Sequence, residues 1–445
     1  MKHNKFTSTW GFILTTVGSA VGMANVWGFP YKLTANGGGA FLLAYLFFII
    51  IFAFFGLSGE YAVGRYSGTG TLGSYEKAWS HVRLSKFGKV IGILPLLGSM
   101  CIAIGYAVII SYVLKSLFQS LTGSLMTVES EAWFQSFSGA NFSVIPFHLI
   151  VIVITLLTCV KGASSIEKAN KIMMPLFFVL FVILAGRVAF LPNALEGYQF
   201  MFNPDWKMLA DPKVLVGAMG QAFFSLSITG SGMIVCGAYL HKDEDIVAGA
   251  KQTALFDTIA ALVAALVMIP ALFSYSANPE GGPGLLFVTL PKILQNMWGG
   301  RVFAIALYLA VLFGGISSLQ NMFEVVCESI LHNFKQLNRK TVLVFIGMMA
   351  FIPGIFMEPI GGVEGAIFGG WGPWMDLVSI YIIPMGATLG AFTWFWIMDK
   401  NTLLDEINTG SKIKYTKTWY YLGKYIYVPM AAILCFVALY YKIAF

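Results

Sequence analysis

Two long apolar stretches of the chain are interrupted where a membrane helix is normally continuous. The interruptions lie at residues 18–25 (GSAVGMAN) and 225–232 (SLSITGSG), and both are small and polar within hydrophobic sequence. They lie about half a chain apart, which is typical of paired broken helices around a binding site in the middle of a membrane. This pattern predicts a membrane transporter.

The composition supports a membrane protein independently of these interruptions. Hydrophobic residues make up 58% of the chain and charged residues 11%, with a mean hydropathy of +0.76, well outside the usage of water-soluble globular proteins. The net charge of +7 comes from basic residues in short segments between apolar runs, which excludes a basic nucleic-acid-binding domain. The five cysteines are scattered singly, without the spacing of a metal site or a disulfide framework.

Eleven apolar runs are candidates for membrane-spanning helices. They cover residues 10–33, 39–64, 88–122, 144–160, 166–187, 213–241, 246–275, 300–333, 340–357, 372–398 and 422–443. Most of the 28 Lys and Arg residues lie between these runs on the side of the N-terminus, so the positive-inside rule predicts a cytoplasmic N-terminus and a C-terminus outside the cell. The start of the chain lacks the pattern of a cleaved signal peptide. We therefore expect a multi-pass protein of the cell membrane.

The longest connections between these runs cover 65–88, 123–143, 188–212 and 276–299, and we expect them to be loops. Glycine-rich segments at 281–284 and 361–362 predict turns on the outer side. The alternative for these glycines is a nucleotide-binding loop, which the absence of a preceding strand pattern disfavours.

Motifs along the whole chain resemble the signature of the neurotransmitter:sodium symporters. They occur in the family's order at 18–30 (GSAVGMANVWGFP), 36–41 (NGGGAF), 60–66, 221–227 (QAFFSLS), 239–246 and 317–324. The resemblance implies an all-α polytopic membrane protein with a five-plus-five inverted repeat and discontinuous helices 1 and 6. Residues 1–445 would form one transporter domain, with 10–187 and 213–398 as the repeats and 422–443 as an eleventh helix. In helix number the chain is similar to the bacterial amino acid carriers of the family.

An unwound membrane helix can bind ions and a zwitterion because its main-chain polar groups lack helical partners. Each such group costs several kcal/mol in hydrocarbon unless a ligand or water satisfies it. Sodium and an ammonium group take carbonyl oxygens, whereas a carboxylate takes amides at the N-terminus of a half-helix. The two interruptions therefore predict a site for sodium and an amino acid.

By resemblance, residues at the two breaks would hold the charged groups of an amino acid. The carboxylate would be bound by the amides of Met23 and Ala24 and by the Tyr106 hydroxyl. The ammonium group would be bound by the carbonyls of Ala20, Phe224 and Ser225 and by the Ser227 hydroxyl. Monoamine carriers of the family have an Asp where this chain has Gly22, so a substrate here must bring its own carboxylate. The alternative is that Gly18 and Gly22 only allow close helix packing.

The resemblance also implies two transported sodium ions, both bound by oxygen atoms. The first would be bound by Ala20, Asn25, Ser225, Asp257 and the substrate carboxylate. The second would be bound by the carbonyls of Gly18, Val21 and Gly314 and the hydroxyls of Ser317 and Ser318. The alternative for the two serines is a hydrogen bond to the preceding turn of their own helix.

Asp257 departs from the family pattern, because members commonly have Asn there and balance charge with chloride or a nearby Glu. The matching Glu position is Ala261 in this chain. A carboxylate within a membrane span is expensive and indicates function, with sodium as its expected partner. We expect Asp257 to replace the chloride, so that transport requires sodium alone. Protonation of Asp257 on the return step would allow proton counter-transport, and a helix-to-helix hydrogen bond from a protonated Asp257 is the structural alternative.

The remaining pocket positions predict a substrate with a large apolar side chain. By resemblance they are Ile102, Tyr106, Phe224, Gly230, Ser318 and Met322. Apolar walls with one flexible Met suit a hydrophobic side chain. Gly230 stands where the leucine carrier of the family has a bulky aromatic residue, which favours bulky or aromatic amino acids. A broad range or small aliphatic amino acids remain the alternative.

The gates of the family are only partly present in this chain. Gly28 replaces the outer Arg, although its partner carboxylate is present as Asp376, so we expect Tyr106 and Phe224 to close the outer side.

On the inner side, Tyr239 matches the family, but His3 and His332 stand in place of an Arg and an Asp. A histidine pair titrates near neutral pH, which would make this gate pH-sensitive. The alternative is that Lys2 or Lys5 contacts Glu328 instead.

Three classes of function are conceivable for such a chain. A sodium-coupled amino acid symporter explains both breaks. An amino-acid-gated channel would need a pore-lining ring or an oligomeric filter. An enzyme is not expected, since the five histidines are far apart and no HExxH or GxSxG motif occurs.

Overall fold

The computed structural model describes residues 5–140, 142–275, 283–357 and 370–443, and within these ranges the regular elements are helices. One β-bridge, between Gly38 and Pro204, is isolated. Residues 281–282 of the turn predicted at 281–284 lie outside the described residues, as do the whole turn predicted at 361–362, Lys2 and His3.

The first half of the chain forms ten α-helices. They are α1 (Thr9–Ala20), α2 (Phe29–Ala35), α3 (Gly39–Ile51), α4 (Ser58–Ser67), α5 (Thr71–Trp79), α6 (Ser85–Ile91), α7 (Ile93–Thr122), α8 (Ser130–Ser138), α9 (Ile145–Cys159) and α10 (Ala163–Val188). A wide helical turn over Ala24–Gly28 leads into α2, and another over Phe52–Leu57 connects α3 to α4.

The second half adds thirteen α-helices within the described residues. They are α11 (Ala194–Phe202), α12 (Trp206–Leu209), α13 (Pro212–Ser225), α14 (Gly232–Ala238), α15 (Ile246–Ser274), α16 (Leu290–Asn296), α17 (Gly300–Asn333), α18 (Arg339–Ile355), α19 (Trp371–Asp376), α20 (Ile383–Phe392), α21 (Lys400–Asn408), α22 (Lys417–Leu422) and α23 (Val428–Tyr441).

Helices occur at all eleven positions where the hydropathy predicted membrane spans. Seven helical stretches in the described residues are long and apolar enough to cross a membrane. An eighth is the pair Thr9–Ala20 and Ala24–Ala35, which is bent by 59°. The remaining three are the short α9 and α18 and the interrupted pair α13 and α14.

The connections predicted to be loops contain short helices, which corrects that expectation. They are α5 and α6, α8, α11 and α12, and α16. Such helices are too short for a hydropathy pattern and depend on capping and packing. Glu129, for example, accepts a hydrogen bond from the amide of Ala132 at the start of α8, and α5 buries Tyr75 and Trp79.

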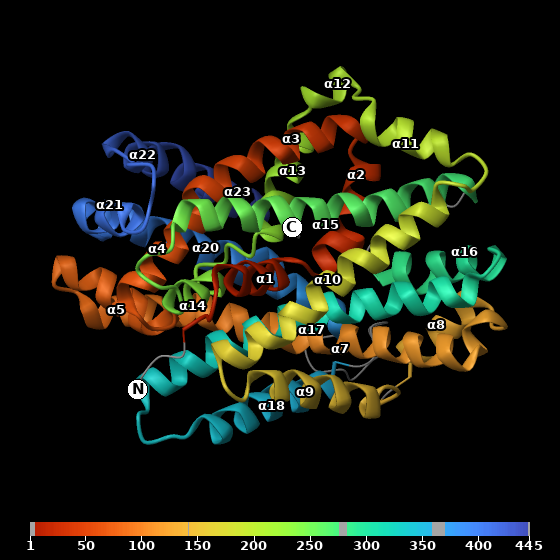
Figure 1. Ribbon diagram of the computed structural model, residues 1–445, viewed down its shortest axis with the longest axis horizontal. Coiled ribbons are helices and arrows are strands. Elements are labelled where there is room, and N and C mark those ends of the chain that lie inside the picture. The colour runs from red at the N-terminus through yellow and green to blue at the C-terminus, as the bar shows by residue number, and fades with distance from the viewer. Residues whose placement is uncertain (1–4, 141, 276–282, 358–369, 444–445) are drawn as a thin grey trace.

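The helix α1 lies in the middle of the molecule. α10, α15 and α17 pack around it, while α7 lies along α17 and α14 packs against α4 (Figure 1). Both interruptions are therefore enclosed by other helices, which is where irregular backbone is tolerated inside a membrane.

Candidate functional site

The first break separates α1 from the segment that continues into α2. α1 ends at Ala20, and Val21 is extended, with φ −70° and ψ 114°. The helical turn resumes over Ala24–Gly28. The side chain of Asn25 turns back, and its Oδ1 accepts a hydrogen bond of 3.0 Å from the amide of Gly22. One main-chain donor of the break is thereby satisfied, and the turn is fixed.

The second break lies between the end of α13 at Ser225 and the start of α14 at Gly232. Ser227 and Gly230 have positive φ angles, 52° and 74°, which no right-handed helix contains. Glu60 of α4 accepts hydrogen bonds from the amides of Gly230 at 2.7 Å and Met233 at 3.1 Å. A buried carboxylate thus holds the unwound segment and the first turn of α14.

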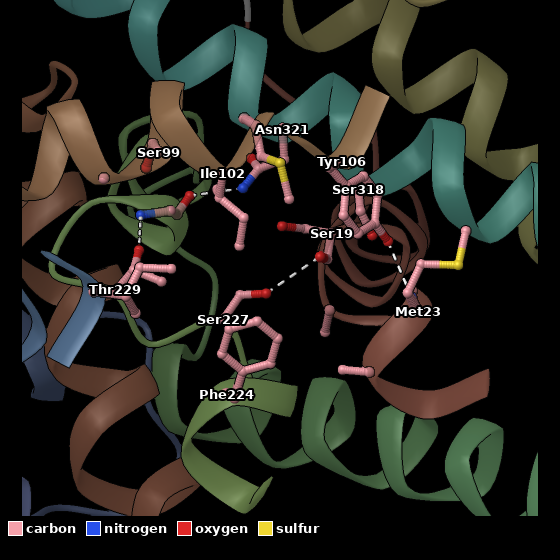
Figure 2. A pocket seen from close by; sticks show the side chains of 17 residues that line it. Ser19, Met23, Ser99, Ile102, Tyr106, Phe224, Ser227, Thr229, Ser318 and Asn321 are labelled. Carbon is pink, nitrogen blue, oxygen red and sulfur yellow. Dashed lines mark hydrogen bonds between the residues drawn. The ribbon is translucent and has the colours of Figure 1, made fainter. Parts of the chain in front are cut away.

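A cavity lies between the two breaks, and we call it the central cavity (Figure 2). Its lining includes most of the residues predicted to bind substrate: Ala20, Gly22, Met23, Ala24, Ile102, Tyr106, Phe224, Ser227, Ser318 and Met322. It also includes residues that the sequence analysis did not single out: Ser19, Gly98, Ser99, Thr229, Gly232, Asn321 and Ile383. None of the described residues that line it carries a charge.

Helical spacing could have pointed to some of the missed residues. Ser99 lies one turn before Ile102 on α7. Asn321 lies one turn after Ser318 on α17. Residues three apart share one face of a helix, so a predicted pocket residue implicates its neighbours one turn away.

One end of the central cavity is formed by main-chain and hydroxyl groups. The amide of Met23 donates a hydrogen bond to the Tyr106 hydroxyl at 3.0 Å. The Ser227 hydroxyl donates to the carbonyl of Ser19 at 3.2 Å. Neutral donors and acceptors from both breaks meet here, which suits a zwitterion better than a group of one charge.

Gly230, predicted to enlarge the pocket, does not line the central cavity. A Cβ at this position would lie 2.9 Å from the Tyr75 hydroxyl and against the carbonyl of Gly386. Thr229 and Gly232 line the cavity instead. The prediction was wrong because an unwound segment has no periodicity from which the direction of a side chain can be inferred.

The predicted ligands of the first sodium ion meet around Asp257, which is fully buried on α15. Asn25 donates from Nδ2 to Asp257 Oδ1 at 2.8 Å, and the Ser225 hydroxyl donates to Asp257 Oδ2 at 2.7 Å. Ser225 is also fully buried and does not line the central cavity. Ala20, the fourth member of the predicted set, lines that cavity at the end of α1.

The predicted ligands of the second sodium ion connect the first break to α17. The Ser318 hydroxyl donates to the carbonyl of Val21 at 2.9 Å and lies 3.3 Å from that of Gly18. The Ser317 hydroxyl donates to the carbonyl of Gly314, within its own helix, at 2.8 Å. Ser317 therefore makes the local contact of the alternative interpretation, whereas Ser318 reaches the break.

A second cavity, which we call the vestibule, adjoins the central cavity. The two share Met23, Ala24, Ile102, Tyr106 and Phe224 in their linings.

The vestibule continues toward α2 and α19, and Gly28, Lys32 and Asp376 line it. Lys32 lies four residues after Gly28, on the same face of the helix. A cation that the sequence analysis missed therefore faces the same chamber as the predicted gate carboxylate.

Tyr239 belongs to a buried polar cluster near the start of the chain, where its ring packs edge-on against Phe6. Its hydroxyl donates to Glu324 and lies 3.5 Å from Glu328. Arg339 forms an ion pair with Glu324. The cluster ties α14, α17 and the start of α18 together.

In the alternative interpretation of the inner gate, Lys2 or Lys5 contacts Glu328. Lys2 lies outside the described residues, and Lys5 makes a different contact. Lys5 Nζ instead donates to the carbonyl of Leu240 at 2.7 Å, and burial lowers its pKa. His332 lies in the last turn of α17 and is partly buried.

Comparison with known proteins identifies the family. The profile described as "Sodium:neurotransmitter symporter family" matches residues 3–142 and 126–444. The "Uncharacterized sodium-dependent transporter YhdH" of Bacillus subtilis (strain 168) is 31% identical over 450 residues, covering 98% of both chains. The "Uncharacterized sodium-dependent transporter MJ1319" of Methanocaldococcus jannaschii is 28% identical over 447 residues, covering 95% of this chain and 88% of the relative.

A solved structure confirms the fold. The "Crystal structure of MhsT in complex with L-phenylalanine" has a TM-score of 0.86 and 31% sequence identity, over 98% of this chain and 99% of that one. The predicted all-α polytopic fold with discontinuous helices 1 and 6 is therefore correct, and the relatives are transporters, as predicted, and not enzymes. The chain belongs to the sodium:neurotransmitter symporter family and is a sodium-dependent membrane transporter.

Proposed function

We propose that the protein imports large, mainly apolar L-amino acids together with sodium, by alternating access. The observation that carries this proposal is the central cavity between two interrupted helices, with polar main-chain groups at one end and apolar walls. The relative MhsT, solved with L-phenylalanine, supports an amino acid as the substrate. Gly98 and Gly232, which line the cavity without side chains, support a large one.

The polar end of the cavity would hold the charged groups of the substrate. The carboxylate takes hydrogen bonds from the amides of Met23 and Ala24 and from Tyr106, near the start of the half-helix that follows the break. The ammonium group donates to the carbonyls of Ala20 and Phe224 and to Ser227.

Two sodium ions would travel with the substrate. The first binds to oxygens of Ala20, Asn25, Ser225 and Asp257, and the second to those of Gly18, Val21, Gly314, Ser317 and Ser318. The short distances from Asn25 and Ser225 to Asp257, and from Ser318 to Val21, support this proposal, because few side-chain movements are needed to direct these oxygens at an ion.

Transport would not require chloride. Asp257 supplies a negative charge beside the first sodium site, and its two contacts of less than 3 Å come from the neutral side chains of Asn25 and Ser225. A carboxylate placed in this way can balance the charge of the cation through the transport cycle.

Alternating access would proceed by movement of the two broken helices against the others. Tyr106 and Phe224, which line both chambers, close the substrate off from the vestibule, and Lys32 replaces the missing arginine as the cation facing Asp376. Tyr239 belongs to the gate at the opposite end.

The proposal is tested by uptake of labelled L-phenylalanine into proteoliposomes with an inward sodium gradient. The twenty amino acids compete in turn, and sodium is replaced by potassium in a parallel set. We expect saturable uptake that requires sodium and is inhibited best by large apolar and aromatic amino acids. Uptake that persists in potassium would contradict sodium coupling, inhibition by small aliphatic amino acids alone would contradict the assigned class, and a non-saturable flux would indicate a channel.

A further inference from the structure

The far end of the central cavity carries a second group of hydrogen-bonding side chains. Ser99, Thr229 and Asn321 line this end (Figure 2). Ser231 lies behind Ser99 and Thr229, 2.5 Å and 3.2 Å from their oxygens. Ile102 and Phe224 lie between this group and the end formed by Met23 and Tyr106 (Figure 2), and the apolar side chains of Met322 and Ile383 also line the cavity.

The hydrogen bond of Ser231 decides which atoms of its neighbours remain available. The Ser231 hydroxyl donates its only proton to the carbonyl of Pro95 at 3.0 Å. Ser99 must therefore donate to Ser231, and this leaves the lone pairs of Ser99 as acceptors. Thr229 likewise donates to Ser231 and accepts from the amide of Gly232 at 3.0 Å, so one lone pair is left.

Asn321 supplies a donor in the same cavity. Its Nδ2 donates one of two N–H groups to the carbonyl of Gly232 at 2.9 Å. Its Oδ1 accepts from the Cys236 thiol at 3.3 Å. A carbonyl can only accept, so Nδ2 must face Gly232, and Oδ1 is then the atom that accepts from the thiol. One N–H of Asn321 is left, and Asn321 lines the same cavity as Ser99 and Thr229 (Figure 2).

We propose that this group recognises a hydroxyl at the tip of the substrate side chain, so that the preferred substrates are of the tyrosine type. A hydroxyl both donates and accepts, and it can donate to Ser99 or Thr229 while it accepts from Asn321. The apolar walls fit the ring, and the first break takes the amino and carboxyl groups. The inference rests on the proposed function, because it concerns the side chain of a substrate that already binds at this site.

A substrate side chain with a purely apolar tip binds less favourably at this end of the central cavity. Phenylalanine would bury the remaining groups of Ser99, Thr229 and Asn321 without a partner, and such groups cost free energy when they lose water. Two neutral hydrogen bonds favour the hydroxylated side chain by about tenfold in affinity. Smaller hydroxylated side chains reach the tip only by giving up contact with the walls.

The test uses the sodium-driven uptake of labelled L-phenylalanine into proteoliposomes. It compares unlabelled tyrosine with unlabelled phenylalanine as inhibitors of this uptake, for the unmodified protein and three variants. Ser99→Ala removes the acceptor, and Thr229→Val removes the second hydroxyl with little change in shape. Ser111→Ala is the matched control, because Ser111 is buried on the same helix and bonds its own helix at Val108.

We expect the unmodified protein and Ser111→Ala to prefer tyrosine by about tenfold. In Ser99→Ala and Thr229→Val, the preference for tyrosine over phenylalanine should fall toward one because tyrosine binds more weakly. The inhibitory potency of phenylalanine should change by less than about twofold. Equal inhibition by both amino acids in the unmodified protein would overturn the inference and leave the proposed function intact. Parallel losses for both amino acids in the variants would also overturn it, since they indicate a structural role. Absence of amino acid uptake altogether would refute the proposed function itself.

Discussion

Asp257 is held by neutral donors on both of its carboxylate oxygens. Asn25 contacts Oδ1 and Ser225 contacts Oδ2, and both partners come from the ends of interrupted helices. A buried charge whose close partners are neutral favours a cation strongly, because no water screens their attraction. The affinity for sodium should therefore depend on this carboxylate more than on any hydroxyl around it.

Asp257→Asn should raise the sodium concentration for half-maximal uptake by about tenfold or more, because the variant removes the negative charge beside the ion. Uptake by the unmodified protein should be the same in chloride and in gluconate. Sodium titrations of uptake in both salts measure these effects.

Asp243→Asn is the control for this change, since Asp243 is exposed in the connection after α14. An unchanged sodium dependence in Asp257→Asn, or a collapse of normal uptake in gluconate, would contradict the assignment of Asp257.

At the scale of elements, the segment between α13 and α14 depends on Glu60 and on the backbone of Gly230. A residue with a side chain at φ 74° is strained, and here a Cβ would also approach the carbonyl of Gly386. The two constraints act together on one residue, so this glycine is required for the shape of the break rather than for pocket volume.

Gly230→Ala should destabilise the folded protein by about 2 kcal/mol and lower its unfolding temperature in detergent. Gly186→Ala is the control, because Gly186 is helical on α10 and a Cβ there would meet no other atom within 4 Å. A thermal unfolding scan of both variants measures the difference. Equal unfolding temperatures would show that the break tolerates a side chain at position 230.

The sequence predicted the long elements well and the details of the unwound segments less well. Apolar runs fix the positions of spans because hydrocarbon admits few alternatives to a helix. Motif residues such as Asn25, Tyr106 and Ser318 were placed correctly near the breaks. Thr229 was missed and Gly230 misassigned because side-chain directions in a non-helical segment depend on contacts with distant helices, here with Glu60 of α4.

Across the whole molecule, the distribution of basic residues implies one orientation in the membrane. Trp298 and Ile413 lie in exposed connections predicted to face opposite sides, with 84% and 62% of their surfaces accessible. In intact cells, a membrane-impermeant maleimide should label Trp298→Cys and should label Ile413→Cys only after the membrane is permeabilised. The reverse pattern would contradict the predicted orientation. The unmodified protein is the control, since its five cysteines are buried or partly buried.

The overall arrangement could be predicted because the spans and the two breaks are local properties of the sequence. Hydropathy did not predict the meeting of α1, α7, α13 and α17 around one cavity, and only the resemblance to the family did, since hydropathy does not specify which helices pack together. Hydropathy likewise did not predict the presence of Lys32 in the vestibule, because this depends on how α2 faces α19.

In the proposed mechanism, the contact between the Met23 amide and the Tyr106 hydroxyl would link occupancy of the substrate site to its access. An arriving carboxylate would compete for that amide and would offer the phenol a better acceptor, so that one hydrogen bond is exchanged for two charge-assisted ones. The ring of Tyr106 would then be held in place by the substrate carboxylate instead of by the amide of Met23. Binding of the substrate and closure of the site would then occur together, and a molecule without a carboxylate would not bring about closure.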